Sequence, residues 1–361
     1  MATTIHRHRL VRGSLDDRHF RKFVDPPREP GRTLDRVAPT VNWRMGLAEN
    51  HDLPLPFRLP NGDRKLRMWA IKHAGRPTRF PADLLRVRAG QVVHARVEGA
   101  AKGEHTIHWH GIEPSPMNDG VGKHSFEIKG AYTYQLQPRD PGFFFYHCHV
   151  NTPLHFEMGL LGALIVDPAR GPGWVAAQNP PDHLVAYDVE RVWVVTAHDS
   201  RWHVLDNSHG LMHNQDANDP RSFSSTGILN DWRPDVFTVS GAVANGTTAI
   251  TDPRAAVSAR VGQTVLLRVL NAAYAIADIS IGAPATVIAQ DGRPFGVPPY
   301  GAYSSPRSLA AGEAFQLNTG QRYDVLVRPT APATIPVAID YLDWRGYGVR
   351  GRARTRITVT A

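Results

Sequence analysis

The most informative segment of this chain reads Gly142-Phe-Phe-Phe-Tyr-His147-Cys148-His149. Its first six residues, Gly142–His147, predict a β-strand, because they are rich in aromatic residues and follow a Pro-containing turn. Alternate residues of a strand point to opposite faces. We therefore expect His147 and His149 to point one way and Cys148 the other, so that one strand serves two separate groups of side chains.

A second histidine cluster lies upstream, in His105-Thr-Ile-His108-Trp-His110, and His155 follows downstream. With the segment above, this places seven potential metal ligands within 51 residues. His108 and His110 are two residues apart and form another pair on one face of a strand. Cys148 is the only cysteine among 361 residues and cannot form an intrachain disulfide. The pattern predicts metal binding.

The spacing predicts two adjacent pockets joined through the covalent path from His147 to His149. Cys148 forms the first with His105 and His155, if those two histidines turn toward it. The second is a nest of four imidazoles, from His108, His110, His147 and His149. A thiolate with two imidazoles is a soft set suited to copper and typical of blue-copper electron-transfer sites. Zinc is the alternative ion for either pocket.

These motifs resemble those of the multicopper oxidases, which include laccases and ascorbate oxidases. Their copper-rich terminal domain carries H-x-x-H-x-H, then H-C-H, a further histidine and G-[M/L]. The resemblance implies type 1 copper at His105, Cys148 and His155, type 2 copper at His108, and type 3 copper at His110, His147 and His149. It also implies cupredoxin-like domains and oxidation of a phenol, an aromatic amine or a low-valent metal ion by dioxygen.

Three departures from the family pattern concern the surroundings of these ligands. The loop from Cys148 to His155 is two residues longer than usual, which would re-aim His155 or widen access to it. Leu160, which cannot coordinate, falls at the axial position of the type 1 site, where it would raise the copper potential; Met158 is the alternative. The His-Trp-His-Gly run and Asn118-Asp119-Gly120 look like the family's first domain, so the domain reads as a composite.

Two acidic residues near the ligands each have two interpretations. Asp119 is either an acid that hydrogen-bonds to a ligand, orients it and supplies protons, or a turn residue before Gly120. Glu157 is interpreted as a solvated loop carboxylate, with substrate contact as the alternative.

The rest of the chain predicts an all-β fold: two cupredoxin-like Greek-key β-sandwich domains with an extended N-terminal arm. We expect an N-terminal extension at 1–60, domain 1 with the copper ligands at 61–168, a linker at 169–185, and domain 2 without evident ligands at 186–361. Domain 2 reads as a diverged repeat of domain 1. The expected strands are Leu66–Ile71, Leu84–Val87, Val92–Val97, Thr106–Ile112, Phe126–Ile128, Tyr132–Leu136, Gly142–His147, Ala163–Val166, Glu190–Thr196, Phe237–Ser240, Val257–Val261, Thr264–Leu270, Ala285–Ile288, Tyr323–Val327, Ile335–Asp340 and Arg356–Thr360.

Composition places the chain among globular proteins, with 42% hydrophobic residues and a formal charge of +8. Its basic residues are mostly arginine spread along the chain, so we expect no nucleic-acid binding. No apolar run is long enough to span a membrane. The N-terminus lacks the apolar core of a secretory signal, which predicts a cytoplasmic protein or an exported one with its leader removed. The histidines of the arm, His6 and His8, could bind copper loosely.

Domain 2 presents a difficulty, because it contains no H-x-H motif. Multicopper oxidases complete their trinuclear centre with eight histidines from two facing domains, and this chain shows four. We therefore expect a homo-oligomer, either a trimer or an assembly that pairs domain 1 with itself, to complete the cluster. The alternatives are a copper nitrite reductase-like enzyme, in which an aspartate replaces His108, and a non-catalytic blue-copper electron-transfer protein.

Overall fold

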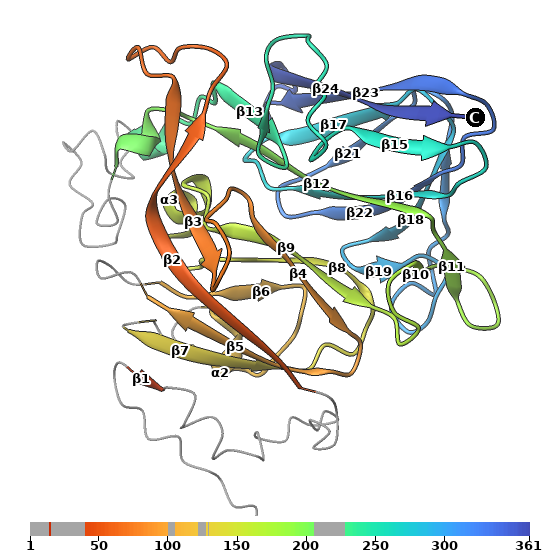
Figure 1. The fold of residues 1–361 in the computed structure, drawn as a ribbon, viewed down its shortest axis with the longest axis horizontal. Coiled ribbons are helices and arrows are strands. Elements are labelled where there is room, and N and C mark those ends of the chain that lie inside the picture. The colour runs from red at the N-terminus through yellow and green to blue at the C-terminus, as the bar shows by residue number, and fades with distance from the viewer. Residues whose placement is uncertain (1–13, 16–39, 100–104, 122–127, 129, 206–227) are drawn as a thin grey trace, which may run out of the picture.

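The computed structural model describes residues 14–15, 40–99, 105–121, 128, 130–205 and 228–361. As predicted, the fold is almost entirely β. In Figure 1 the sandwich of the first half lies below that of the second half. Among the described residues, no helix combines the length and apolarity needed to cross a bilayer.

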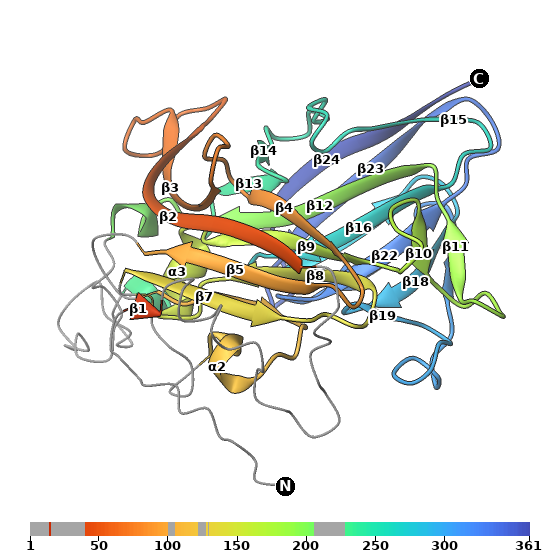
Figure 2. The same cartoon turned by 60° about the horizontal axis from the view of Figure 1, so that its bottom comes forward.

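Within the described residues, the first half contains two short helices and two sheets, ordered β1-β7-β5-β2-β3 and β4-β9-β8-β6. Helix α2 lies beside β7 (Figure 2), where Asn118 accepts a hydrogen bond from the backbone of Gln135. The elements are β1 (Ser14–Leu15), β2 (Thr40–Pro54), β3 (Lys65–His73), β4 (Ala82–Arg88), β5 (Val92–Glu98), β6 (His108–His110), α2 (Pro116–Asp119), β7 (Ala131–Leu136), β8 (Gly142–His147), α3 (Thr152–Glu157) and β9 (Leu161–Asp167).

The second half also contains two sheets, with β14-β13-β12-β16-β22-β18-β19 in one, where β20 also pairs with β18, and β15-β24-β23-β17-β21 in the other. A separate hairpin, β10 (Trp174–Ala176) with β11 (Leu184–Ala186), lies in the connector. The elements are β12 (Val189–His198), η2 (Trp202–Val204), η4 (Ile228–Asn230), β13 (Val236–Val239), β14 (Ala242–Val243), β15 (Val257–Arg260), β16 (Val265–Asn271), β17 (Ile276–Ile281), β18 (Ala285–Gln290), β19 (Arg293–Pro294), β20 (Arg307–Leu309), β21 (Ala314–Leu317), β22 (Arg322–Val327), β23 (Ala333–Leu342) and β24 (Val349–Thr360).

The two halves share one topology. In the first, β7-β5-β2-β3 pair as antiparallel, parallel and antiparallel neighbours, and β22-β16-β12-β13 repeat this order in the second. The other sheets correspond likewise, with β4-β9-β8-β6 matched by β15-β24-β23-β17 as parallel, antiparallel and antiparallel neighbours. The interpretation of the chain as a diverged repeat is therefore confirmed.

Strand β2 is the counterpart of β12 and lies inside the sheet, between β5 and β3. Its residues Thr40–Gly46 run parallel to β5, and Met45–Pro54 pair with β3. The sequence predicts an extended segment in this region, but it does not predict that the segment pairs with β5 and β3. The domain boundaries themselves stay predictions.

Strand β8 is buried on both faces, which explains its continuous run of aromatic residues. Phe144 and Tyr146 point into the core of the first sandwich. Phe143 and Phe145 point the other way and pack against Val194 of β12 and neighbouring residues of the second half. This double burial holds the end of β8, where the ligand motif begins, between the two sandwiches.

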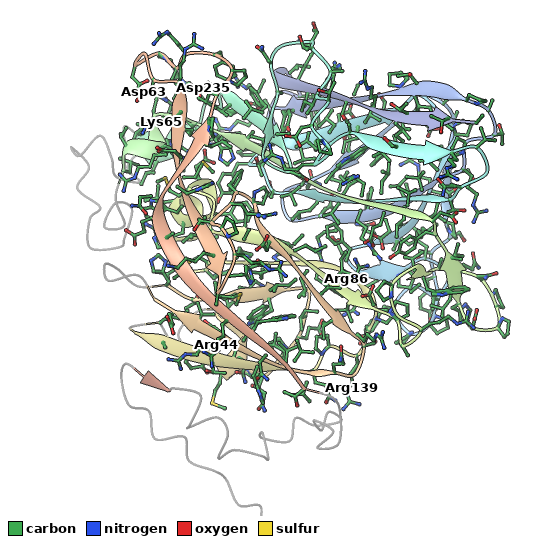
Figure 3. All side chains as sticks on the ribbon, viewed as in Figure 1. Arg44, Asp63, Lys65, Arg86, Arg139 and Asp235 are labelled. Atoms are coloured by element: carbon green, nitrogen blue, oxygen red, sulfur yellow. The ribbon has the colours of Figure 1, made fainter. Side chains whose placement is uncertain are left out.

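A buried ion network also joins the halves. The guanidinium of Arg86 on β4, labelled in Figure 3, pairs with two carboxylates: Nε lies 2.7 Å from Oδ2 of Asp167, and Nη1 lies 2.7 Å from Oε2 of Glu190. Glu190 of β12 is in turn 2.8 Å from Arg268, which pairs at 2.7 Å with Asp324. Since removal of one partner would leave a buried charge uncompensated, the network constrains how the two halves meet.

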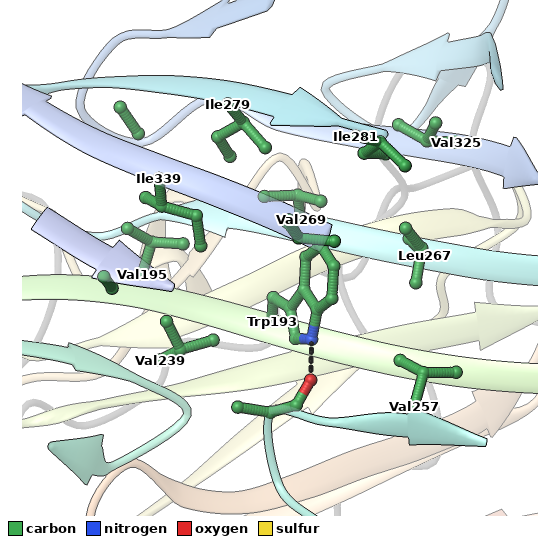
Figure 4. Packing of buried hydrophobic residues seen from close by; sticks show 14 of the residues in the cluster. Trp193, Val195, Val239, Val257, Leu267, Val269, Ile279, Ile281, Val325 and Ile339 are labelled. Carbon is green, nitrogen blue, oxygen red and sulfur yellow. Dashed lines mark hydrogen bonds between the residues drawn. The ribbon is translucent and has the colours of Figure 1, made fainter. Parts of the chain in front are cut away.

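The core of the second half is built on Trp193 of β12, which is fully buried among aliphatic side chains from both of its sheets (Figure 4). Its indole N–H donates a hydrogen bond of 2.8 Å to the carbonyl of Ala255. The buried tryptophan therefore has a hydrogen-bond partner and gives β12 a fixed position.

Most expected strands are present within a few residues of their predicted bounds. The strand expected over Thr106–Ile112 is shorter and covers only His108–His110, because Gly111 has a φ of 85° and turns the chain. Of Phe126–Ile128, the first two residues lie outside the described residues, and Ile128 is buried but not in a strand. The strands that the sequence does not predict are β1, β2, β10, β11, β14, β17, β19, β20 and β21, and it does not predict α2 or α3.

Candidate metal centre

The alternation of β8 continues into the ligand motif and divides the ligands as predicted. Cys148 follows Tyr146 into the core of the first sandwich, whereas His147 follows Phe145 toward the second half. The His147 ring stacks on that of Phe145, with ring centroids 5.2 Å apart. Strand β6 repeats the division, since Trp109 is buried in the core between His108 and His110.

The thiol pocket brings together the three predicted residues, all fully buried. The Sγ atom of Cys148 lies 3.2 Å from Nδ1 of His155 and 3.6 Å from Nδ1 of His105. The two imidazole rings are themselves 4.9 Å apart, and Trp69 packs edge-on against His155 at 5.1 Å. One sulfur and two nitrogens therefore converge in a pocket that is closed to solvent.

Electrostatics in this pocket favour the thiolate. Burial alone would raise the pKa of Cys148, but the two imidazoles outweigh it and lower that pKa to about 5. Burial would likewise lower the pKa of His105, yet Cys148 and Glu49 together raise it to about 9. The pocket thus holds a deprotonated sulfur near neutral pH, which is the form that binds metals.

Glu49, which the sequence does not single out, belongs to this pocket. Its Oε1 lies 3.4 Å from Nε2 of His105. A carboxylate on one ring nitrogen fixes the tautomer, which leaves Nδ1 facing Cys148. Glu49 comes from β2, and its role depends on the long-range pairing of that strand, for which the local sequence carries no signal.

The four imidazoles of the nest also lie together. One nitrogen from each of His108, His110 and His147 lies within 4.8 Å of the others. The ring of His149 is next to them, 5.4 Å from that of His108 and 5.6 Å from that of His147. The structure thus brings all seven predicted ligands into two neighbouring groups.

Hydrogen bonds orient two of these rings. His147 donates from Nδ1 to the carbonyl of Cys148 at 2.8 Å, and His108 donates from Nδ1 to the carbonyl of Asp119 at 2.8 Å. Both therefore present Nε2 to the nest. Burial is the main cause that lowers the pKa of His147, His149 and His110, the last to about 3. These three imidazoles are neutral at physiological pH, as ligation requires.

Asp119 ends α2, and its carboxylate is also near His108, with Oδ1 3.3 Å from Nδ1. Gly120 follows with a φ of 72°, and there an added Cβ would overlap the carbonyl of Ile107. Asp119 is therefore both a turn residue and an orienting group for His108. Its part in proton supply stays a prediction.

The nest opens into a cavity of about 640 Å³ between the two halves. His108, His110 and Asp119 line it on one side, and Asp291, Gly320 and Arg322 on the other. No described histidine of the second half lines this cavity. The second half instead contributes a cation, because the guanidinium of Arg322 lines the cavity. This guanidinium packs against Gly111, where an added Cβ would lie 2.5 Å from Nη2.

The structure contradicts wider access to His155, one of the two outcomes expected of the longer loop after Cys148, and it contradicts a solvated Glu157. The extra residues of the loop lead into helix α3, with Pro153 in the first turn, and His155 is fully buried, so access to it is not widened. Glu157 is not solvated either: its exposed fraction is 3%. Its carboxylate accepts hydrogen bonds from the backbone N–H of Asp199 and the indole of Trp232. The axial position stays open, since Met158 and Leu160 are both buried in the same cluster as Cys148.

Comparison with known proteins agrees with this geometry. Residues 67–171, which include every proposed ligand, match the family described as multicopper oxidase. This part of the chain is a multicopper oxidase domain. Over 375 residues the chain is 25% identical to copper resistance protein A of Escherichia coli, covering 92% of this chain and 56% of that protein. It thus spans about half the length of this relative.

Solved structures extend the likeness over both halves. The blue copper oxidase of Nitrosomonas europaea superposes with a TM-score of 0.62 at 22% identity, covering 89% of this chain and 86% of that one. A copper nitrite reductase of the same organism gives 0.56 at 18% identity, with 88% and 94% covered. At these identities the likeness shows the fold alone, and it confirms two cupredoxin-like sandwiches.

Proposed function

We propose that this chain is a laccase-like oxidase that passes electrons from an organic or metal-ion donor to dioxygen, which is reduced to water. One observation carries the proposal: Cys148 lies in the thiol pocket, while its covalent neighbours His147 and His149 line the nest. This arrangement suits electron transfer, because an electron accepted in the thiol pocket could pass along the covalent path from Cys148 to the histidines of the nest. The multicopper oxidase match over this segment supports the same reading.

The donor sets fit copper. Cys148 with His105 and His155 is a soft set, and the nest offers neutral imidazoles. By likeness to the family, type 1 copper would be held by the thiol pocket, and type 2 and type 3 copper by the nest. When bound, copper would supply one-electron redox chemistry, which no side chain of the protein provides.

The chain's own residues keep the two pockets in place. The backbone N–H of His149 donates to the hydroxyl of Thr106 at 3.2 Å, and that of Cys148 donates to the carbonyl of Leu160 at 3.0 Å. Complete burial of His105 and His155 excludes water from the sulfur. Since both rings are buried, an electron from a phenol, an aromatic amine or a low-valent metal ion would cross intervening side chains to reach Cys148.

We also propose that another subunit completes the nest. The cavity beside it receives no described histidine from the second half. A homo-oligomer, either a trimer or an assembly pairing first halves, would bring further imidazoles to it.

Oxygen uptake tests the proposed oxidase directly. Copper-loaded protein is supplied with a phenolic donor while oxygen consumption and blue absorption are followed. Uptake that depends on both copper and donor supports the oxidase. Blue protein without uptake would indicate an electron-transfer protein, and nitrite turnover would favour the reductase whose structure is similar. A colourless, zinc-loaded preparation would reject all three.

Copper counting tests the assembly. Total copper per chain, electron paramagnetic resonance and the mass of the oligomer are measured on one preparation. More than one copper per chain, with a type 2 signal that depends on the oligomer, supports a nest completed between subunits. One copper per chain in a monomer would contradict it.

A further inference from the structure

A third group of ligand-type side chains lies outside both pockets. It consists of Glu157, the last residue of α3, with His198 at the end of β12 and His203 in η2. One donor atom from each lies within 4.8 Å of the other two. Their exposed fractions are 3%, 1% and 2%. The multicopper oxidase motifs include none of the three.

The spacing suits a small cation better than hydrogen bonds. Oε1 of Glu157 is 3.7 Å from Nε2 of His203 and 3.9 Å from Nδ1 of His198. Both distances exceed the usual length of a hydrogen bond. Zinc binds nitrogen and oxygen at about 2.0–2.2 Å, so that two of its ligands lie about 3.4 Å apart in a tetrahedron and about 4 Å at wider angles. The observed separations fall within that interval.

His203 presents a nitrogen with no partner. Its Nδ1 donates to the carbonyl of Arg67, which leaves the lone pair of Nε2 directed to the side of Glu157. Among the described residues, that Nε2 is buried without a hydrogen bond. Buried polar atoms are nearly always satisfied, and a bound cation is one way to satisfy this one.

His198 can offer a lone pair as well. Its Nε2 lies 2.9 Å from the hydroxyl oxygen of Thr196, which can accept a hydrogen bond from an N–H at that position. In that tautomer Nδ1 is free to coordinate. In the other tautomer Nδ1 donates to the backbone carbonyl of Glu157 at 3.0 Å, and a bound cation would replace that hydrogen bond.

Groups outside the cluster hold these ligands in place. Glu157 accepts from the backbone N–H of Asp199 at 2.6 Å and from Nε1 of Trp232 at 3.1 Å. Together with the bond from His203 to Arg67, these contacts orient each donor much as ligands of known metal sites are oriented. A buried carboxylate also costs less when a cation neutralises it.

We propose that Glu157, His198 and His203 bind one divalent cation of the zinc class. Nitrogen and oxygen donors without sulfur suit zinc, whereas the softer set at Cys148 suits copper. The site is closed to solvent, which is typical of a structural ion. It fastens α3, the helix that carries His155, to β12 and η2 of the second half.

The test measures zinc and copper per chain in the purified, metal-loaded full-length protein. We expect one zinc per chain that resists brief dialysis against chelator. His203→Gln should lose that zinc and keep its copper and blue absorption. Trp232→Phe is the matched control, because it removes a hydrogen bond to Glu157 but no ligand; it should bind zinc more weakly than wild type and retain much more of it than His203→Gln does. Wild-type protein that takes up no zinc from zinc chloride would overturn the site, as would equal losses in both variants.

X-ray absorption at the zinc edge gives a result that does not depend on whether the variants fold. In wild-type protein we expect nitrogen and oxygen neighbours only, with the scattering pattern of two imidazoles. A sulfur neighbour would mean that zinc occupies the Cys148 pocket and would overturn the proposal. Neither measurement depends on oxidase activity.

Discussion

Ile276 lies directly opposite Leu342 in the pairing of β17 with β23. In the pairing of β6 with β8, which takes the same place in the topology of the first half, His108 lies directly opposite His147. Equivalent strand pairs therefore carry an apolar pair at one end in the second half and two candidate metal ligands in the first.

His108→Ala should stop oxygen reduction and leave the blue absorption intact. The ring lies in the nest and not in the thiol pocket, so the copper held by Cys148 keeps its ligands. We expect oxygen uptake to fall at least about 100-fold, since even loss of an outer-sphere partner costs 10–100-fold in metal sites. His94→Ala on β5 is the matched control and should retain uptake. Full activity of His108→Ala would refute the division into two pockets.

The thiol of the copper-free protein should titrate near pH 5. Its pKa is lowered to about 5 from an ordinary value of 9, so thiolate persists from alkaline pH down to that point and is lost below it. Because the folded state holds the thiolate more favourably than the unfolded state does, the thiolate adds to the free energy of unfolding. This contribution is complete above pH 9 and declines as the pH falls toward 5. Ultraviolet thiolate absorption, measured as wild type minus Cys148→Ser, reports the midpoint. A midpoint near 9 would show that His105 and His155 do not contact the sulfur in solution.

Leu160→Met should lower the potential of the blue site if Leu160 is axial. A thioether would then approach a position that leucine leaves without a ligand, and a weak axial ligand lowers the potential of copper bound to a thiolate. The potential is read by redox titration of the blue absorption. Met158→Leu is the companion variant, and it should have no effect in that case. A rise in potential with Met158→Leu, and none with Leu160→Met, would assign the axial place to Met158.

Much of the ligand arrangement could be predicted because it depends on a local rule. Alternation along a strand separates Cys148 from His147 and His149, whatever the rest of the fold does. The bounds of β8 were predicted correctly for a similar reason: Gly142–His147 is apolar throughout because both faces are buried. Burial on both faces leaves a strong signal in the sequence itself.

The missed residues depend on contacts between distant segments. Glu49 lies beside His105 because β2 pairs with distant strands; it sits at the shift of register between β2 and β3, and β2 itself is rich in charged and polar residues that hide its strand character. Glu157 lies 41 residues from His198 in the sequence. No local spacing links them, so Glu157 was interpreted as a solvated carboxylate. Helix α3 was missed because a six-residue helix has too few positions to show a period.

Gly120→Ala should destabilise the protein and disturb the nest together. At a φ of 72°, alanine costs about 1–2 kcal/mol in backbone strain, and here its Cβ would also overlap the carbonyl of Ile107 beside His108. Gly62→Ala is the matched control, since its φ is 91° but no atom lies within 4 Å of the added Cβ. Chemical unfolding should show a loss of about 1–2 kcal/mol for Gly62→Ala and clearly more for Gly120→Ala. Copper bound to the nest should fall only in Gly120→Ala. Equal losses of stability, with the nest unchanged in both variants, would mean that the turn at Gly120 does not position His108.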